Sequence, residues 1–486
     1  MKALNIAKKF SAILALLLAV VMAFSACGGD ANTADGEDNN DPTVSDNEQT
    51  DSNDTQSGED ANNSGTASGT TSKSGNSTGG STKWESNYLN NISAALKKKE
   101  IHVIMWRKYT KTEKSLVNSF QSKTGIKVRT TVTTENEYGT KLASLIAGKD
   151  SPDVLCCSSN NFPSFVVKSM QALDTKVFRL NDSIWYKNYM NYLKVNGKYF
   201  GVAINGCWSC EDCNYVTYYN KTALSGLSDP YSLYKSGKWN WAAAKDIASK
   251  FSKKSSNNTG MSLQSKDLYM LSAGVDLIKF DGSKFTSSLD NAKTTKTITD
   301  AWNEVSKLVG DNLVKNWDPT GISKGTTGLF SAISYGLYNE GGWFDNVSTK
   351  GGINDLKAVP VPGPSQSGAY TPTRPKAWGV AKGADNAEGA AYFLRYFLDP
   401  SNCNMNSTFY NSQFKEVFYT ICSKSAKKQI ITSSGVIDYI QSGAYRTMCE
   451  DLANAASGQQ TTILNQKKTT INNAVKRANG EVKRVK

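Results

Sequence analysis

Residues 28–83 carry almost no side chain that could enter a hydrophobic core. The segment consists largely of Asp, Asn, Ser, Thr, Gly and Glu, and Val44 is its only large aliphatic residue. A chain of this composition cannot bury enough apolar surface to offset the entropy lost on ordering. We therefore expect residues 27–83 to form a disordered tether with a root-mean-square span of roughly 40 to 45 Å. Folding is then confined to residues 84–486.

The first 26 residues have the layout of a bacterial export signal. Lys2, Lys8 and Lys9 precede an apolar run from Ala12 to Phe24, and Ser25-Ala26 supplies small residues for cleavage. The run of about thirteen apolar residues is shorter than the roughly twenty needed to span a bilayer. We therefore expect residues 1–26 to be a signal peptide that is removed.

Cys27 would then become the first residue of the mature chain. Cys27 follows Phe24-Ser25-Ala26 and precedes Gly28-Gly29, which resembles the lipobox of bacterial lipoproteins, with Phe24 where Leu is usual. The resemblance implies acylation of the Cys27 thiol, as by palmitate. It places the protein on the extracellular face of the cytoplasmic membrane.

Charge is distributed unevenly along the chain. The formal net charge is +13, but the tether holds eleven acidic residues against Lys73 and Lys83, and the signal adds three lysines, so residues 84–486 carry +19. A basic surface attracts anionic wall polymers, lipid headgroups or acidic ligands, whereas scattered lysines also keep an exported protein soluble. Because no run exceeds Lys97-Lys98-Lys99, we favour solubility. We expect no nucleic-acid partner.

The pattern of apolar residues in the remaining 400 or so residues predicts alternating strands and helices in two domains. Helix signals include an apolar stripe with Trp302 on the core side, and Asp385 with Glu388 resembles a capping box. The expected elements, in chain order, are a strand at 101–106, a helix around 116–120, a strand at 126–129, a helix at 138–146 ended by Gly148, a strand at 153–155, a helix at 298–309 and a helix from 385 to 398.

Several short phrases then occur in an order that resembles the extracellular solute-binding proteins of ABC transporters, the family of maltose-binding protein. No single phrase is specific, but their order and spacing cover residues 100–480. The phrases are Ile104-Met105-Trp106, residues 120–128, residues 138–142 running into 147–154, residues 197–203, Tyr218-Tyr219-Asn220-Lys221, Gly341-Gly342-Trp343, residues 359–363 and Trp378-Gly379-Val380-Ala381.

The resemblance implies a type II periplasmic-binding-protein-like α/β fold with two discontinuous lobes joined by a hinge. One lobe would hold residues of about 100–204 plus part of 310–370, and the other about 215–310 plus the C-terminal part. Ligand would bind between the carboxyl ends of strands, and closure of the lobes would present it to the transmembrane subunits of an ABC permease. We expect a monomer without a cofactor.

The abundance of aromatic residues favours a carbohydrate ligand, with an oligosaccharide expected. The chain has 10 Trp, 22 Tyr and 17 Phe, and flat aromatic rings complement the C–H faces of sugars. Position by position, the resemblance implies ligand contacts from Trp343 above all, with Trp208 and Trp378 as weaker candidates because a Trp is often a core residue. Polar contacts would come from the loop 107–111, which includes Lys111, from Glu135 and Asn136, and from Ser159, Asn160 and Asn161. In that last loop Cys157 stands where relatives place an aromatic.

Eight cysteines remain after Cys27, and Cys207, Cys210 and Cys213 form a C-x-x-C-x-x-C segment. In an exported protein the even count favours disulfides, such as Cys207 or Cys213 with Cys156 or Cys157, or unpaired thiols. A zinc site made of these three thiolates and a fourth is the weaker alternative.

Other function classes are less favoured. His102 is the only histidine and lies in an expected buried strand, so Ser-His or Cys-His chemistry lacks a base, and we expect no enzyme. A glycosidase would need only two carboxylates and is not excluded by counting. A surface glycan binder or sensor without transport, and a transport receptor for peptide or ferric iron, remain as alternatives.

Overall fold

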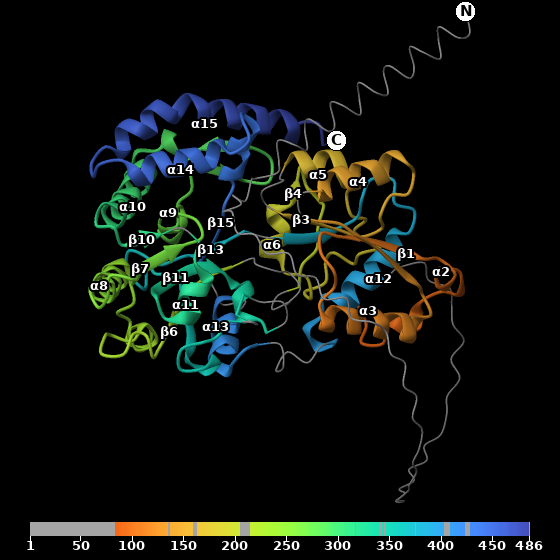
Figure 1. Ribbon diagram of the computed structural model, residues 1–486. Helices are drawn as coiled ribbons and strands as arrows, with labels where there is room; N and C mark the ends of the chain where they lie inside the picture. The colour runs from red at the N-terminus through yellow and green to blue at the C-terminus, as the bar shows by residue number, and fades with distance from the viewer. Residues whose placement is uncertain are drawn as a thin grey trace, which may run out of the picture. The chain divides into compact units, whose positions relative to one another are not determined.

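The computed structural model describes residues 83–134, 137–158, 163–204, 214–315, 317–339, 343–344, 347–374, 376–402, 409–422 and 428–485. These residues form two main groups of strands with helices packed against each, and several short strand pairs besides (Figure 1). Within this part of the chain, we find no helix with the length and apolar character that a membrane crossing requires. The expected signal peptide (1–26), the lipid-bearing Cys27 and nearly all of the tether lie outside the described residues.

The first sheet is built around β1. β1 (Ile101–Met105) pairs in parallel with β2 (Val128–Val132), and a parallel bridge from Val103 to Val154 connects it to β3 (Leu155–Ser158). β14 (Lys376–Gly379), which comes from much later in the sequence, pairs antiparallel with β3. The elements that accompany this sheet are η1 (Tyr88–Asn91), α2 (Ala94–Lys97), α3 (Lys111–Thr124), α4 (Tyr138–Ala147), α5 (Ser164–Ser169), α6 (Lys187–Tyr192), the hairpin of β4 (Lys194–Val195) and β5 (Lys198–Tyr199), α12 (Ala387–Phe397) and η6 (Pro400–Asn402).

The second sheet has five strands in the order β10-β7-β11-β6-β12. Its strands are β6 (Tyr215–Asn220), β7 (Thr259–Leu263), β10 (Val314–Lys315), β11 (Thr327–Ile333) and β12 (Leu356–Pro360). β10, β7 and β11 run parallel, and β6 is antiparallel to β11 and β12. The accompanying helices are α7 (Pro230–Lys235), α8 (Trp241–Ser252), α9 (Leu268–Ser272), α10 (Ala292–Gly310), α11 (Pro319–Lys324), α13 (Ser412–Cys422), α14 (Ala444–Asn454) and α15 (Gln460–Val482).

Short elements complete this part of the chain. β8 (Ile278–Phe280) and β9 (Phe285–Ser287) form a hairpin, and β13 (Thr371–Thr373) pairs in parallel with β15 (Gln429–Ile431). The 3₁₀ turns are η3 (Ser288–Asp290), η4 (Ser334–Leu337), η5 (Ile353–Asp355) and η7 (Ser434–Tyr439).

The helix patterns seen in the sequence correspond to real core faces. Leu116, Val117 and Phe120 are buried on α3, and Phe120 meets Phe393 of α12 edge to face at 5.4 Å. Trp302 is fully buried on α10, as its stripe predicts. Gly148 caps the end of α4, as expected. Apolar burial of this kind supplies the main favourable free energy of folding.

Two local expectations are wrong in register. β2 begins at Val128 rather than Ile126, because its pairing with β1 starts at Val128 opposite Ile101; Ile126 is fully buried in the segment between α3 and β2. α12 is capped by Asn386, whose side chain accepts a hydrogen bond from the backbone N–H of Gly389. The Asp385–Glu388 box is therefore off by one residue, because an asparagine caps a helix as well as an aspartate does.

Strand pairing also determines which segments share a sheet. Residues 310–370, part of which we expected with residues 100–204, supply β10, β11 and β12 to the same sheet as β6. By contrast, two later elements belong with the first sheet: β14 pairs with β3, and α12 packs against α3. The lobe bounds themselves stay a prediction.

Candidate functional site

The carboxyl ends of the strands in both sheets lie next to the segments that connect the sheets. In the first sheet, Ser158 at the end of β3 pairs with Lys376, where the chain enters β14. In the second, the N–H of Ser334, which follows β11, donates to the carbonyl of Asn214 at the start of β6. Open α/β sheets bind ligands at such edges, so these two edges form the candidate site.

At the first edge, Trp106 and Arg107 directly follow β1. The Trp106 ring lies 6.1 Å from Tyr138 and 6.3 Å from Trp378. The Arg107 guanidinium donates two hydrogen bonds, of 2.6 and 2.9 Å, to the two carboxylate oxygens of Glu113. A bidentate pair of this kind fixes the direction of the arginine.

Glu113 is held in turn by the start of α3. Its side chain accepts from the backbone N–H of Thr110 at 2.8 Å, and its own N–H donates to the Thr110 hydroxyl, which makes a capping box. Glu113 is fully buried. Sequence analysis missed this box, although the Thr-x-x-Glu spacing shows it. Lys111, an expected ligand contact, is the first residue of α3 and is exposed.

At the second edge, three aromatic residues gather, which we call the aromatic cluster: Trp317 after β10, Tyr335 after β11, and Trp343. Trp343 meets Trp317 edge to face at 4.7 Å and Tyr335 at 6.0 Å. The exposed fraction of Trp317 is 47%. A Cβ at Gly336 would lie 2.7 Å from the Trp343 ring, so glycine there lets the indole lie against η4.

The cluster rests on the core of the second sheet. Phe330 of β11 lies 5.3 Å from Trp317 and 5.7 Å from Trp343, and Tyr218 of β6 lies 6.0 Å from Trp343. Buried rings behind a half-exposed pair fix its geometry, and perpendicular indoles offer a flat face beside a ring edge. That shape suits a sugar ring.

The sequence predicts a ligand contact at Trp343 but gives no such prediction for Trp317 or Tyr335. Tyr335 follows the apolar run of β11, and the strand-end rule used for the first sheet would have found it. Trp317 gave no such signal, because β10 is only two residues long and shows no periodicity.

Polar groups accompany the aromatic cluster at this edge. Arg374 donates to Asp267 at 3.1 Å and to Ser265 at 3.3 Å, and its guanidinium lies 5.6 Å from the ring of Tyr215. Asp267 is fully buried and also accepts from the Tyr445 hydroxyl at 2.7 Å. Burial, followed by the charge of Asp267, raises the pKa of Tyr445, so its hydroxyl stays protonated and donates.

A buried polar cluster links the two sheets beside the connecting segments. The side-chain carbonyl of Asn214 accepts hydrogen bonds from Thr373 at 2.9 Å, Gln429 at 3.2 Å and Tyr189 of α6 at 3.2 Å. Tyr186 of α6 donates to Gln429 at 2.6 Å. These hydrogen bonds join α6 to β13, β15 and the residue that leads into β6.

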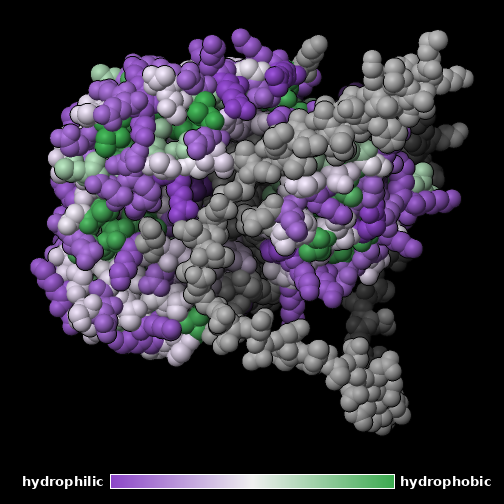
Figure 2. Space-filling model, turned by 45° about the horizontal axis from the view of Figure 1, so that its top comes forward, coloured by the Kyte–Doolittle hydropathy of each residue, from purple (hydrophilic) through white to green (hydrophobic). Residues whose placement is uncertain are grey.

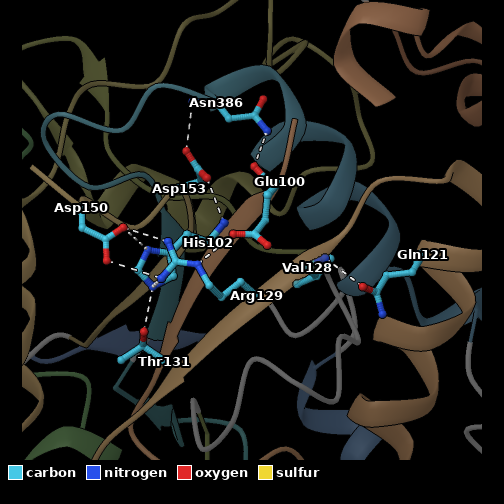
Figure 3. Close-up of polar contacts among 9 residues, drawn as sticks. All are labelled: Glu100, His102, Gln121, Val128, Arg129, Thr131, Asp150, Asp153 and Asn386. Carbon is cyan, nitrogen blue, oxygen red and sulfur yellow. Dashed lines mark hydrogen bonds and ion pairs between the residues drawn. The ribbon is translucent and has the colours of Figure 1, made fainter. Parts of the chain in front are cut away.

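The only histidine lies at the opposite, amino-terminal end of the first sheet (Figure 3). His102 is 4% exposed on β1, as expected, and its Nε2 lies 2.8 Å from the Thr131 hydroxyl. Arg129 lies within 3.3 Å of the same nitrogen and bonds Asp150. Burial, then the charge of Arg129, lowers the pKa of His102, which keeps the ring neutral.

Figure 3 also shows the hydrogen bonds that connect this network to neighbouring elements. Asp153 accepts from the backbone N–H of His102 at 2.9 Å and from that of Asn386 at 3.0 Å, while the Asn386 amide donates to the Glu100 carbonyl. On the far side of β2, Gln121 of α3 accepts from the Val128 N–H. These bonds join β1, β2 and the start of α12.

Trp378 is placed differently from its expected role. It is 1% exposed on β14, between Trp106 and Phe397, so its ring is covered in this structure. Its part in ligand binding stays a prediction, as does that of Lys111. Glu135, Asn136, Ser159, Asn160, Asn161 and Trp208 lie outside the described residues.

The cysteine hypotheses are equally untested. Cys207, Cys210 and Cys213 lie outside the described residues. Cys156 is buried on β3, and Cys449 is buried on α14, where burial and then the charge of Asp267 raise the pKa of its thiol. No group of three His, Cys, Asp or Glu side chains suited to a metal ion occurs within the described ranges.

Comparison with known proteins agrees with this architecture. Residues 115–414 match the family model of the bacterial extracellular solute-binding protein. No curated protein sequence matches at a significant level.

Among solved structures, an ABC substrate-binding protein of Listeria monocytogenes in complex with cycloalternan has a TM-score of 0.56 at 17% identity, over 78% of this chain and 99% of that one. The sugar-binding protein MalE of Xanthomonas citri has a TM-score of 0.56 at 12% identity, over 79% of this chain and 97% of that one. The galacto-N-biose/lacto-N-biose I-binding protein of a Bifidobacterium longum ABC transporter has a TM-score of 0.53 at 15% identity, over 78% of this chain and 97% of that one.

These structures show the type II periplasmic-binding-protein-like fold expected from the sequence. The family model covers more than half of the sequence. The chain therefore belongs to the family of bacterial extracellular solute-binding proteins.

Proposed function

We propose that this protein is a lipid-anchored receptor that captures an oligosaccharide between two lobes and delivers it to an ABC permease. The observation that carries the proposal is the aromatic cluster of Trp317, Tyr335 and Trp343 at the carboxyl edge of the second sheet. Trp317 is half-exposed and packs against Trp343, so the pair offers a flat apolar surface on which a sugar ring could stack.

The polar groups at both edges fit a sugar as well. Arg107 and Arg374 each pair with a fully buried carboxylate, Glu113 or Asp267, so their positions are fixed and their charges are largely balanced. Guanidinium N–H groups held in this way suit sugar hydroxyls. The structural neighbours support the ligand class, since they are a protein in complex with cycloalternan, a sugar-binding protein and a protein in complex with lacto-N-biose.

Closure is the proposed mechanism. A ligand that touches Trp106 and Arg107 on one edge and the aromatic cluster on the other gains contacts only when the lobes come together, so it shifts the equilibrium toward the closed form. A permease that recognises the closed form then receives the ligand.

Tryptophan fluorescence tests the binding step. Titration of the mature chain with oligosaccharides should change the emission, and Trp317→Phe and Trp343→Phe should each reduce that change. Trp84→Phe, near the start of the described chain and outside the candidate site, should leave the change in emission as it is in the wild type. If both site variants kept the full change, the aromatic cluster would not be the binding surface.

Uptake measurements test delivery. A strain that lacks this protein should lose uptake of the bound sugar if the protein serves a permease. Unchanged uptake with intact sugar binding would favour the alternative of a surface glycan binder or sensor. A response to peptides or ferric iron alone would favour a non-sugar ligand.

A further inference from the structure

Basic residues cluster around the C-terminal half of α15. Lys476, Arg477, Lys483 and Arg484 are all exposed there, and Lys284 of the β8–β9 hairpin is exposed beside them. We call these five residues the basic face. Figure 1 shows α14 and α15 together at one side of the second sheet, and Figure 2 turns this side forward, where hydrophilic residues predominate.

Direct contacts hold the members of the basic face together. The Asn479 amide of α15 donates to the Phe285 carbonyl at 3.0 Å and accepts from the Phe285 N–H at 2.7 Å, directly beside Lys284. Lys476, Arg477 and Arg484 border one shallow depression with Gly480. Lys476 and Lys483 are seven residues apart, as are Arg477 and Arg484, and this spacing puts each pair on one side of α15 and its C-terminal cap.

The cations of the basic face are poorly balanced by acids. Elsewhere on α15, Lys467 pairs with Asp451 and Lys468 with Asp290. Within the described residues, Arg484 bonds Glu481, but no carboxylate lies within ion-pair distance of Lys284, Lys476 or Lys483. Four of the five cations are close together in the sequence, and the fold adds Lys284 to them.

An exposed apolar side chain lies beside these cations. The Arg477 guanidinium donates to the carbonyl of Tyr439 at the end of η7, and the next residue, Ile440, is 41% exposed. Cations around an exposed aliphatic group are typical of surfaces that meet a lipid interface, where the charges pair with headgroups and the apolar group enters the boundary region.

We infer that the basic face docks on an anionic phospholipid surface. Charge complementarity carries the inference, since a basic residue near an anionic leaflet strengthens membrane partitioning about fivefold. The lipid expected on Cys27 would keep the folded part within reach of the membrane. Docking would then set the orientation of the protein, which a tether alone leaves free.

Vesicle sedimentation tests this inference on the mature chain from residue 27 with Cys27→Ser, so that no lipid contributes. In 0.1 M salt the protein should sediment with phosphatidylcholine vesicles that contain about a third phosphatidylglycerol and stay in solution with pure phosphatidylcholine. In 1 M salt binding should be lost, because the screening length falls from about 10 Å to about 3 Å.

Charge reversal tests the location of the surface. The triple variant Lys284→Glu, Lys476→Glu and Lys483→Glu should lower the partition coefficient about 100-fold, and Ile440→Ser should lower it a few fold. The triple variant Lys97→Glu, Lys98→Glu and Lys99→Glu makes the same charge change on exposed residues of α2 and should lower it less than about threefold. Thermal unfolding checks that each variant folds, and glutamine variants at the same positions replace any that does not.

Three results would overturn the inference. The first is equal binding to neutral and anionic vesicles, and the second is an equal loss in both triple variants, which would reflect net charge alone. The third is binding to a soluble glycerol-phosphate polymer without binding to anionic vesicles, which would assign the basic face to a wall polymer instead.

Discussion

Replacement of Trp343 by alanine tests the aromatic cluster most sharply. If Trp343 contacts ligand, Trp343→Ala should weaken oligosaccharide binding by about 1.5 to 4 kcal/mol, the cost of losing a buried aromatic anchor. That range corresponds to a rise in Kd of roughly 10- to 1,000-fold. Titration calorimetry with the wild type and the variant measures it.

The same change also costs folding free energy. Trp→Ala in a full core costs about 3 to 5 kcal/mol. Trp343 is partly exposed and packs against Trp317, Phe330 and Tyr218. We therefore expect Trp343→Ala to lower the unfolding free energy by about half as much as a fully buried Trp would. Denaturant unfolding measures this loss separately from binding.

Trp84→Ala is the matched control. Trp84 is also a partly exposed indole, packed 5.3 Å from Tyr88 and from Tyr392 and 4.3 Å from the Arg179 guanidinium. It should lose similar stability and keep its affinity for ligand. An affinity unchanged in Trp343→Ala, or lowered equally in both variants, would refute the assignment of Trp343 to the site.

Three further predictions concern the support of the site. Glu113→Gln should weaken both stability and ligand binding, with a stability loss of about 3 kcal/mol in denaturant unfolding, because it leaves the Arg107 guanidinium without its buried carboxylate; full stability would mean that the pair contributes nothing. The unfolding free energy should fall as pH drops below about 6.5 toward the lowered folded-state pKa of His102, because the unfolded chain binds the proton first. Urea unfolding of the wild type and His102→Gln at pH 7.5, 6 and 5 should show this loss of unfolding free energy chiefly in the wild type. Equal losses in both proteins would mean that His102 is not its source. Deletion of residues 28–83 should leave Kd unchanged in titration calorimetry, because a disordered tether makes no ligand contacts; a several-fold change in Kd would mean that these residues take part in binding.

The sequence predicts the parts of this fold that local pattern controls. The helix faces of α3 and α10 and the buried strand β1 follow from apolar spacing, because burial of one face is what makes such elements stable. The resemblance to solute-binding proteins correctly implied the fold class, since the order of several phrases carries information that no single phrase holds.

Long-range pairing is what the sequence leaves open. The sequence of residues 310–370 does not predict that their strands pair with β6 and β7, because strand register depends on partner strands that lie far away in the sequence. Trp317 is hidden for a different reason, because β10 is only two residues long and shows no periodicity. The burial of Trp378 is likewise set by its partners Trp106 and Phe397, which come from distant segments.

A thermal-shift screen of the mature chain tests the central claim, sugar capture, most directly. The screen compares oligosaccharides with amino acids, short peptides and ferric citrate. A ligand present at a hundred times its Kd adds about 2.7 kcal/mol to the unfolding free energy, so the account predicts a clear rise in melting temperature with an oligosaccharide that Trp343→Ala reduces. A rise with peptides or iron alone, and none with any sugar, would contradict it.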